Sequence, residues 1–474
     1  MARAKWMIGI ALLLVLGTVP PAQAEEPKQA KNIFLMISDG LGFNGWEAAK
    51  YHQGQLPYDN DDFTFFGMTT YMKNPRDSDT EDASAGTDGA QENGAGAEQG
   101  YDKVKMWSDF DYHRGDIGGD YDITDSAAAA TAMYTGTKTY GGAINYGVDG
   151  ETLKTIAEYA AEQGKSTAAV SSVQFFHATP AAVDAHAESR QNTKDIASEM
   201  VHSDLDVIMG GSEDPDLEVD EWKGDARANG FAVVDLGSQW DDLAAGKNVP
   251  EKVAGIFSGK TLDGRDNLTL QKMTQGALNV LENNDNGMFM MVEGGAVDWN
   301  NHENDIKLML REQVDFDNSV QEVMTWVDEN SDWDESLLIV TSDHECGGIW
   351  GPNTVLDNNG TPNDYTDDEI ADTWQNVVEG EDGIPVVQYT SGGHTNALVP
   401  VWARGAGAEL LEGLVDGKDE TAAEFWTQFG GSEGWDGSYI DNTDLFTVMH
   451  ASSTAPEPGT LGLLSISGLL FGLW

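Results

Sequence analysis

The chain has 474 residues, of which 40% are hydrophobic and 23% charged, so it is long enough to bury a large core. It carries 81 acidic and 26 basic residues, a formal net charge of −55 at pH 7. A surface this acidic repels nucleic-acid backbones and anionic membrane faces, and no nucleic-acid-binding surface is expected. Two interpretations of the charge stay open: an ordinary solvated acidic surface, or adaptation to high salt, which screens self-repulsion. The single cysteine, Cys346, excludes an intramolecular disulfide.

The N-terminus has the pattern of a secretory signal peptide. Arg3 and Lys5 precede an apolar run over 6–16, and the small-residue motif AQA follows at 22–24. We therefore expect residues 1–24 to be removed and the protein to be exported to the periplasm, the cell envelope or the medium. The alternative is an N-terminal anchor or a buried helix.

Strands and helices are predicted to alternate along the chain. Short apolar runs bounded by turn residues predict strands at 32–37, 65–71, 166–173, 206–209, 231–234, 288–292, 337–341 and 397–402. Capping and stop signals predict helices at 126–134, 152–163, 193–201, 268–281 and 306–327. Because the strands are continuous apolar runs, the pattern favours an α/β fold with a mostly parallel sheet covered by helices on both faces.

Three polar, acidic stretches interrupt this pattern, near 77–100, 212–262 and 353–382, and we expect them to be surface insertions. The tail over 451–474 is also distinct: Pro-Glu-Pro at 456–458 precedes an apolar run that is shorter than the about 20 residues of a membrane span. This run could equally be a helix docked on the body or a disordered end.

Acidic residues follow or end three of the predicted buried strands: Asp39, Glu293 and Asp343. Ligands of parallel α/β sheets bind outside the carboxyl ends of the strands, so these carboxylates should converge there. Converging carboxylates repel one another unless a cation or a shared proton compensates.

Histidines accompany these carboxylates. His302 follows Asp298 by four residues, His344 is adjacent to Asp343, and His394 lies in a glycine-rich loop. Neutral imidazoles combined with carboxylates suit zinc or a similar ion.

Ser126 and Arg190 complete a candidate catalytic set. Ser126 begins an alanine-rich helix, where free backbone amides and the macrodipole favour negative charge, although a capping role is the alternative. The guanidinium of Arg190 could bind a phosphate group bidentately. A serine, two or three metal ions and an arginine are the components of metal-assisted phosphoryl transfer.

Several segments resemble the alkaline phosphatase family: 35–42, 124–136, 177–190, 293–302, 340–344, 393–395 and 439–446. The likeness spans about 31–450 with consistent order and spacing. It implies a single catalytic domain over 25–450 with the three-layer α/β/α sandwich of that family. It also implies hydrolysis of small-molecule phosphate monoesters through a phosphoserine intermediate.

The resemblance implies a role for individual residues. Ser126 would be the nucleophile and Arg190 would hold the phosphate. The first of two zinc ions would be bound by Asp298, His302 and His394, and the second by Asp39, Asp343 and His344. A third ion, usually magnesium, would be bound by Asp39, Thr179 and Glu293.

This chain departs from the best-known bacterial member at two positions near the third ion. His177 replaces an Asp and Trp299 replaces a Lys, so the identity of the third ion stays open. We expect His177 to lie near that ion, in contact through water. The family's disulfides are absent, and the family's common homodimer is allowed but not required by this sequence.

Two other functions are considered. A phosphodiesterase of the same superfamily fits the same residues, whereas a sulfatase would need a Cys/Ser-x-Pro-x-Arg setting that Ser126 lacks. A non-catalytic cation or phosphate binder would suit the acidic insertions and the tail, which resembles a Pro-Glu-Pro envelope-sorting signal without its basic cluster.

Overall fold

The computed structural model describes residues 28–73, 100–114, 123–212, 219–235, 237–258, 264–265, 268–357, 369–370 and 374–453. The predicted signal peptide, the apolar part of the tail and nearly all of the first acidic insertion lie outside these residues. Among the described residues, no helix is both long and apolar enough to cross a membrane.

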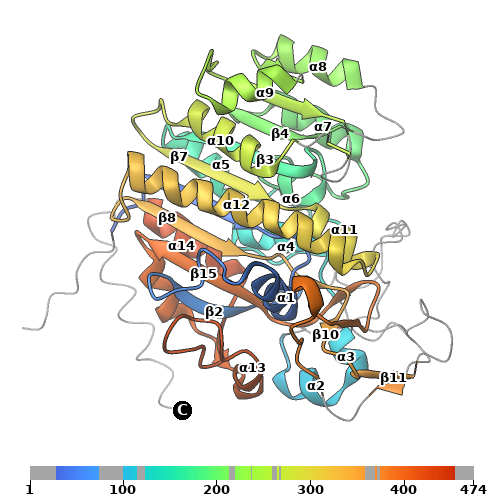
Figure 1. Ribbon diagram of the computed structural model, residues 1–474. Coiled ribbons are helices and arrows are strands. Elements are labelled where there is room, and N and C mark those ends of the chain that lie inside the picture. The colour runs from blue at the N-terminus through green and yellow to red at the C-terminus, as the bar shows by residue number, and fades with distance from the viewer. Residues whose placement is uncertain are drawn as a thin grey trace, which may run out of the picture.

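A large twisted sheet runs through the molecule (Figure 1) in the strand order β16-β17-β2-β15-β8-β1-β7-β3-β4-β6-β5. Its strands are β1 (Asn32–Ile37), β2 (Thr64–Thr69), β3 (Ser166–Gln174), β4 (Val207–Gly211), β5 (Ala232–Val234), β6 (Val253–Phe257), β7 (Met288–Glu293), β8 (Ser336–Thr341), β15 (Val399–Gly405), β16 (Gly417–Lys418) and β17 (Ser438–Asp441). From β8 to β5 every neighbouring pair is parallel, whereas β15 is antiparallel to both β8 and β2. The sheet is therefore mostly parallel, as predicted.

Helices cover both faces of this sheet, which confirms the three-layer α/β/α sandwich. Alternate residues of β1 enter two separate cores, with Ile33 and Leu35 in one and Phe34 and Met36 in the other. The first core contains α4 (Ser126–Thr135), α5 (Ile156–Glu162), α6 (Ala178–Ala181), α7 (Thr193–His202), α8 (Val219–Ala228) and α14 (Thr443–Ser453). The second contains α1 (Phe43–Gln53), α9 (Gly237–Ala244), α10 (Leu270–Leu281), α11 (Ala296–His302), α12 (Ile306–Asn330) and α13 (Glu420–Phe425).

The prediction for 212–262 was only partly right. Its strand at 231–234 is confirmed as β5, but the described part of this stretch is not an irregular insertion. It contains α8, β5, α9 and β6, and its two strands complete one edge of the central sheet through the pairing of β6 with β4. Each of its helices buries only a few apolar side chains, such as Trp222 of α8 and Trp240 of α9. The average composition is therefore polar although one side of each helix belongs to the core.

One predicted helix begins later than expected. The predicted helix started at Thr152, but α5 begins after Thr155. The Thr155 hydroxyl accepts a hydrogen bond from Glu158 N, and Glu158 Oε2 accepts one from Thr155 N. This capping box fixes the first turn of the helix.

Short elements surround the carboxyl edge of the central strands. They are α2 (Lys103–Ser108), α3 (Phe110–Arg114), β9 (Glu345–Cys346), β10 (Ile349–Trp350), β13 (Gln388–Tyr389) and β14 (His394–Thr395). In the last acidic insertion, partly outside the described residues, β11 (Val355–Asp357) pairs with β12 (Glu369–Ile370). The pairing of β9 with β14 sets His394 opposite Cys346. The rim of the sheet is thus built from segments far apart in the sequence.

Candidate active site

Three buried carboxylates meet at the carboxyl edge of the sheet, as the strand pattern predicted. Glu293 ends β7, and Asp39 and Asp343 follow β1 and β8 by two residues. The parallel register aligns Ile37 of β1 with both Glu293 and Thr341, so these strand ends lie level with one another. All three carboxylates are fully buried.

Many oxygens of this cluster lack a hydrogen-bond donor within the described part of the chain: both of Asp39, Oε1 of Glu293, Oδ2 of Asp343 and Oγ1 of Thr179 in α6. The remaining carboxylate oxygens are held by the protein. Glu293 Oε2 accepts from the Ser171 hydroxyl, and Asp343 Oδ1 accepts from Gly40 N at 3.1 Å. Glu293 and Asp343 are therefore each oriented through one oxygen and present the other, and Asp39 presents both, as cation-binding groups do.

Burial raises the pKa of Asp39 well above its ordinary range, and the adjacent Asp343, Asp298 and Glu293 raise it further. Burial also raises the pKa of Glu293 to about 7. The cause is the same in both cases: negative charges are concentrated away from water. A bound cation would remove this penalty.

Two histidines and Asp298 form a second cluster beside the first. Asp298 Oδ2 lies 3.4 Å from Nε2 of His302, one turn later in α11, and its Oδ1 lies 3.5 Å from Nε2 of His394. Nδ1 of His302 donates to Gly392 O at 2.7 Å, and Nδ1 of His394 donates to Thr124 O at 2.9 Å. The neutral imidazoles therefore carry their proton on Nδ1, and the lone pair of each Nε2 faces Asp298. This is the tautomer that binding of a metal through Nε2 requires.

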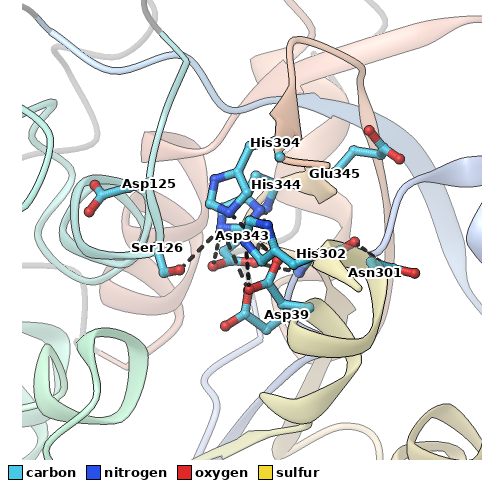
Figure 2. Close-up of polar contacts among 12 residues, drawn as sticks. Asp39, Asp125, Ser126, Asn301, His302, Asp343, His344, Glu345 and His394 are labelled. Atoms are coloured by element: carbon cyan, nitrogen blue, oxygen red, sulfur yellow. Dashed lines mark hydrogen bonds and ion pairs between the residues drawn. The ribbon is translucent and has the colours of Figure 1, made fainter. Parts of the chain in front are cut away.

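Ser126 borders both clusters (Figure 2). Its hydroxyl oxygen lies 3.2 Å from His344 Nε2, which is 3.1 Å from Asp343 Oδ2 and 3.6 Å from Asp39 Oδ1. Ser126 is the first residue of α4, and Asp125 caps this helix by accepting a hydrogen bond from Ala128 N at 3.0 Å. The hydroxyl is thus fixed at a helix N-terminus, where negative charge is favoured.

Arg190 reaches the same place from a different segment. Its Nη1 is 3.0 Å from Asp125 Oδ2, and its Nη2 donates to His177 Nε2 at 3.1 Å. Burial and the Arg190 charge lower the pKa of His177 to about 3, so this imidazole is neutral at neutral pH. The guanidinium is therefore held in one orientation beside Ser126.

A cavity of about 180 Å³ opens at this edge, lined by Ser126, His177, Arg190, Asp298, Trp299, His302, Glu303 and His394. The floor of the cluster needs a glycine: Gly40 has φ +70°, and a Cβ there would lie 2.4 Å from Asp298 Oδ1. All residues singled out from the sequence thus gather at one edge of the sheet.

Ligand atoms within 4.8 Å of one another form three groups among the described residues: Asp298, His302, Cys346 and His394; Asp39, His177 and Glu293; and Asp39, Asp298 and His344. These groups overlap the three ligand sets implied by the resemblance but are not identical to them. Cys346 is an additional member of the group with His302 and His394, and Asp298 belongs to two of the groups. Cys346 and Glu303 were not predicted as site residues. Cys346 follows His344 by two residues, a signal that the sequence contained.

The family model described as Alkaline phosphatase matches residues 112–426. Alkaline phosphatase 3 of Bacillus subtilis is 28% identical over 473 residues, covering 85% of this chain and 91% of that relative. Alkaline phosphatase 4 of the same organism is 31% identical over 358 residues, covering 64% and 76%. The alkaline phosphatase of the Antarctic bacterium TAB5 shares the fold, with a TM-score of 0.60 and 22% identity over 90% of this chain and 98% of that structure. The chain therefore belongs to the alkaline phosphatase family of phosphate-ester hydrolases.

Proposed function

We propose that the protein is an exported alkaline phosphomonoesterase that hydrolyses small phosphate monoesters through a phosphoserine at Ser126. One observation carries this proposal: the Ser126 hydroxyl lies 3.2 Å from His344 Nε2, beside buried carboxylates with free oxygens, in a cavity that Arg190 also lines. This arrangement combines a nucleophile, candidate metal ligands and a phosphate-binding cation within one small space.

The residues present fit the metal ions that the family implies. A nitrogen-rich set of Asp298, His302 and His394 suits zinc, as does the mixed set of Asp39, Asp343 and His344. The oxygen atoms of Asp39, Thr179 and Glu293 suit magnesium. When bound, such ions lower the pKa of a hydroxyl or water and stabilise a departing oxygen.

The chain's own residues would position the reaction. Ser126 Oγ forms a bond to phosphorus as the bond to the leaving alcohol breaks, and water later hydrolyses the phosphoserine. The guanidinium of Arg190 donates to phosphate oxygens, while Asp125 fixes its orientation at 3.0 Å. The N-terminus of α4 adds the partial positive charge of its free amides.

His177 supports a water-mediated contact to the third ion. Because a guanidinium can only donate, His177 Nε2 accepts from Arg190, and the proton of the neutral ring is on Nδ1. A protonated nitrogen cannot bind a cation directly, but it can donate to a water that does. We propose magnesium for the third ion, because the free ligand atoms that Asp39, Thr179 and Glu293 present are all oxygens.

Export through residues 1–24, envelope sorting by the Pro-Glu-Pro tail and homodimer formation belong to the same proposal. They are carried by the sequence and by the family resemblance alone. Adaptation to salt also stays a prediction, to be checked by thermal unfolding with and without added salt.

The test is hydrolysis of an aryl phosphate monoester and of the matching diester across pH 6 to 11, with and without chelation. We expect chelator-sensitive monoester hydrolysis that increases into the alkaline range. Ser126→Ala should lower kcat by about 10⁴-fold or more, while elemental analysis still finds zinc and magnesium bound.

Ser198→Ala, the same change on α7 outside the cavity, is the matched control and should keep full activity. A preference for the diester, or an active Ser126→Ala variant with its metals bound, would contradict the proposal. Metal binding without turnover in the wild type would favour the non-catalytic binder.

A further inference from the structure

One turn of α11 presents an aromatic ring and a carboxylate to the catalytic cavity. Trp299 and Glu303 are four residues apart, lie on the same side of the helix, and both line the cavity. Glu303 N donates to Trp299 O at 3.2 Å, which closes this last turn. The Trp299 ring packs edge-on against the His177 ring, with centroids 5.8 Å apart and an interplanar angle of 85°.

These two residues lie at the mouth of the cavity and not at its floor. Ser126 is buried, whereas Trp299 is partly exposed and Glu303 is exposed to solvent. A phosphate group held by Ser126 and Arg190 therefore directs its leaving alcohol outward, toward Trp299 and Glu303. The chemistry of this turn should select among leaving groups.

The Glu303 carboxylate has no structural partner that would explain its position. It makes no hydrogen bond or ion pair with the described residues, and it follows the last residue of α11. A negative charge at a helix C-terminus is unfavourable, because the macrodipole favours cations there. An indole face and a carboxylate one turn apart are instead complementary to an ammonium group, through cation–π attraction and charge.

We propose that Trp299 and Glu303 form a leaving-group subsite for phosphate monoesters of amino alcohols, in which an ammonium group follows the ester oxygen by two carbons. This inference rests on the proposed function, since it assigns a substrate class to the same cavity. The phosphate end is recognised by the catalytic residues, and the cationic end by this turn of α11.

The test compares three small esters that differ in the charge of the leaving group: ethanolamine phosphate, propyl phosphate and phosphoglycolate. The wild type, Glu303→Gln and Glu303→Lys are assayed on each, and the ratios of kcat/KM are compared between proteins. The intrinsic reactivity of each ester cancels in this comparison. Both replacements are exposed, and lysine at a helix C-terminus is favourable, so folding should be retained.

We expect Glu303→Gln to lower the ratio of ethanolamine phosphate to propyl phosphate about threefold, as for a solvent-exposed charge pair. Glu303→Lys should lower it further, to about one tenth, and should raise the relative rate on phosphoglycolate. Trp299→Leu should lower the ratio about twofold, as for an exposed cation–π contact.

Glu412→Gln is the matched control, because it removes the same charge from an exposed position in the 3₁₀ segment Ala408–Leu414. This segment follows β15, whose antiparallel course ends beside Leu337, at the opposite edge of the sheet from Ser126. Its substrate ratio should equal that of the wild type.

An unchanged ratio of ethanolamine phosphate to propyl phosphate in Glu303→Gln would overturn the inference. Equal changes of this ratio in Glu303→Gln and Glu412→Gln would also overturn it, because they would show that the overall negative charge of the protein attracts the ammonium group. A wild type that hydrolyses none of the three esters and no aryl phosphate would overturn the proposed function itself. Hydrolysis of all three esters with unchanged ratios would remove only the subsite.

Discussion

The four parallel strands β1, β3, β7 and β8 differ between their two ends in how their polar side chains are paired. Donors with protein partners lie at the amino ends, and carboxylates with unpaired oxygens lie at the carboxyl ends. At the amino edge, Asn32 Nδ2 donates to Ser331 Oγ at 3.1 Å and to Ser336 Oγ at 3.2 Å. Lys165 Nζ donates to the carbonyls of Lys31 at 2.7 Å and Ala30 at 3.2 Å. The polar side chains of this edge are thus paired with neutral partners of the protein.

At the carboxyl edge the carboxylates Asp39, Glu293 and Asp343 lie close together, and each keeps at least one oxygen without a donor among the described residues. Asp39 and Glu293 are fully buried there, and burial raises the pKa of each. The amino edge therefore stabilises the sheet by its own contacts, whereas the carboxyl edge keeps unpaired acceptor oxygens that suit a cation. The paired polar groups and apolar core of the sheet thus offset an unfavourable charge cluster at its carboxyl edge.

Among the variants that test the two edges, Asp39→Asn should have the largest effect. We expect kcat/KM on an aryl phosphate to fall by more than about 100-fold, because the proposed function makes Asp39 a ligand of two ions. After chelation the variant should unfold about 1–3 kcal/mol less easily than the wild type, because one buried unpaired charge is gone. Urea unfolding with and without chelator measures this, and a chelated variant less stable than the wild type would contradict the assignment of the edges.

Asn32→Ala tests the amino edge. It should lower the free energy of unfolding by about 1–2 kcal/mol through the loss of two buried hydrogen bonds. The loss should be equal in chelated and metal-loaded protein, with kcat within about twofold of the wild type. A stability loss that appears only with metals bound would show that the two edges are coupled.

The smallest effect is the pH dependence of Lys165. Burial, and then the Lys31 charge, lower the pKa of Lys165 from 10.5 to about 8. Between these two values the unfolded chain binds more protons than the folded one. The cost of burying the Lys165 ammonium group therefore falls as pH rises from 8 to 10.5. We expect the stability of the wild type relative to Lys165→Met to increase across this range, as measured by urea unfolding at each pH. A flat difference would contradict a buried, weakly compensated ammonium group.

Much of the site was visible in local patterns. The apolar runs ending before Asp39, Glu293 and Asp343 predicted a common edge. Asp298 and His302 were singled out as candidate metal ligands, and the structure adds that they lie one turn apart on α11. Ser126 was located by the capping residue before it and the alanines after it. Thr179 came only from the family resemblance, because a lone threonine in a short helix carries no pattern of its own.

The misjudged stretch over 212–262 shows the opposite case. Its strands β5 and β6 are short, and composition averaged over the stretch hides the buried side of α8 and α9. Only the pairing of β6 with β4 makes this stretch part of the sheet.

Local sequence patterns were enough to predict the alternation of strands and helices, the mostly parallel sheet and the meeting of carboxylates at one edge. These features follow from short-range periodicity and from the shared direction of parallel strands. The surroundings of that edge depend on long-range packing. Tertiary packing brings Arg190 into contact with Asp125 and His177 and sets Cys346 opposite His394. It also places Trp299 and Glu303 at the mouth of the cavity. Most of these contacts join segments far apart in the chain, and such packing leaves no periodic signal in the residues that make it.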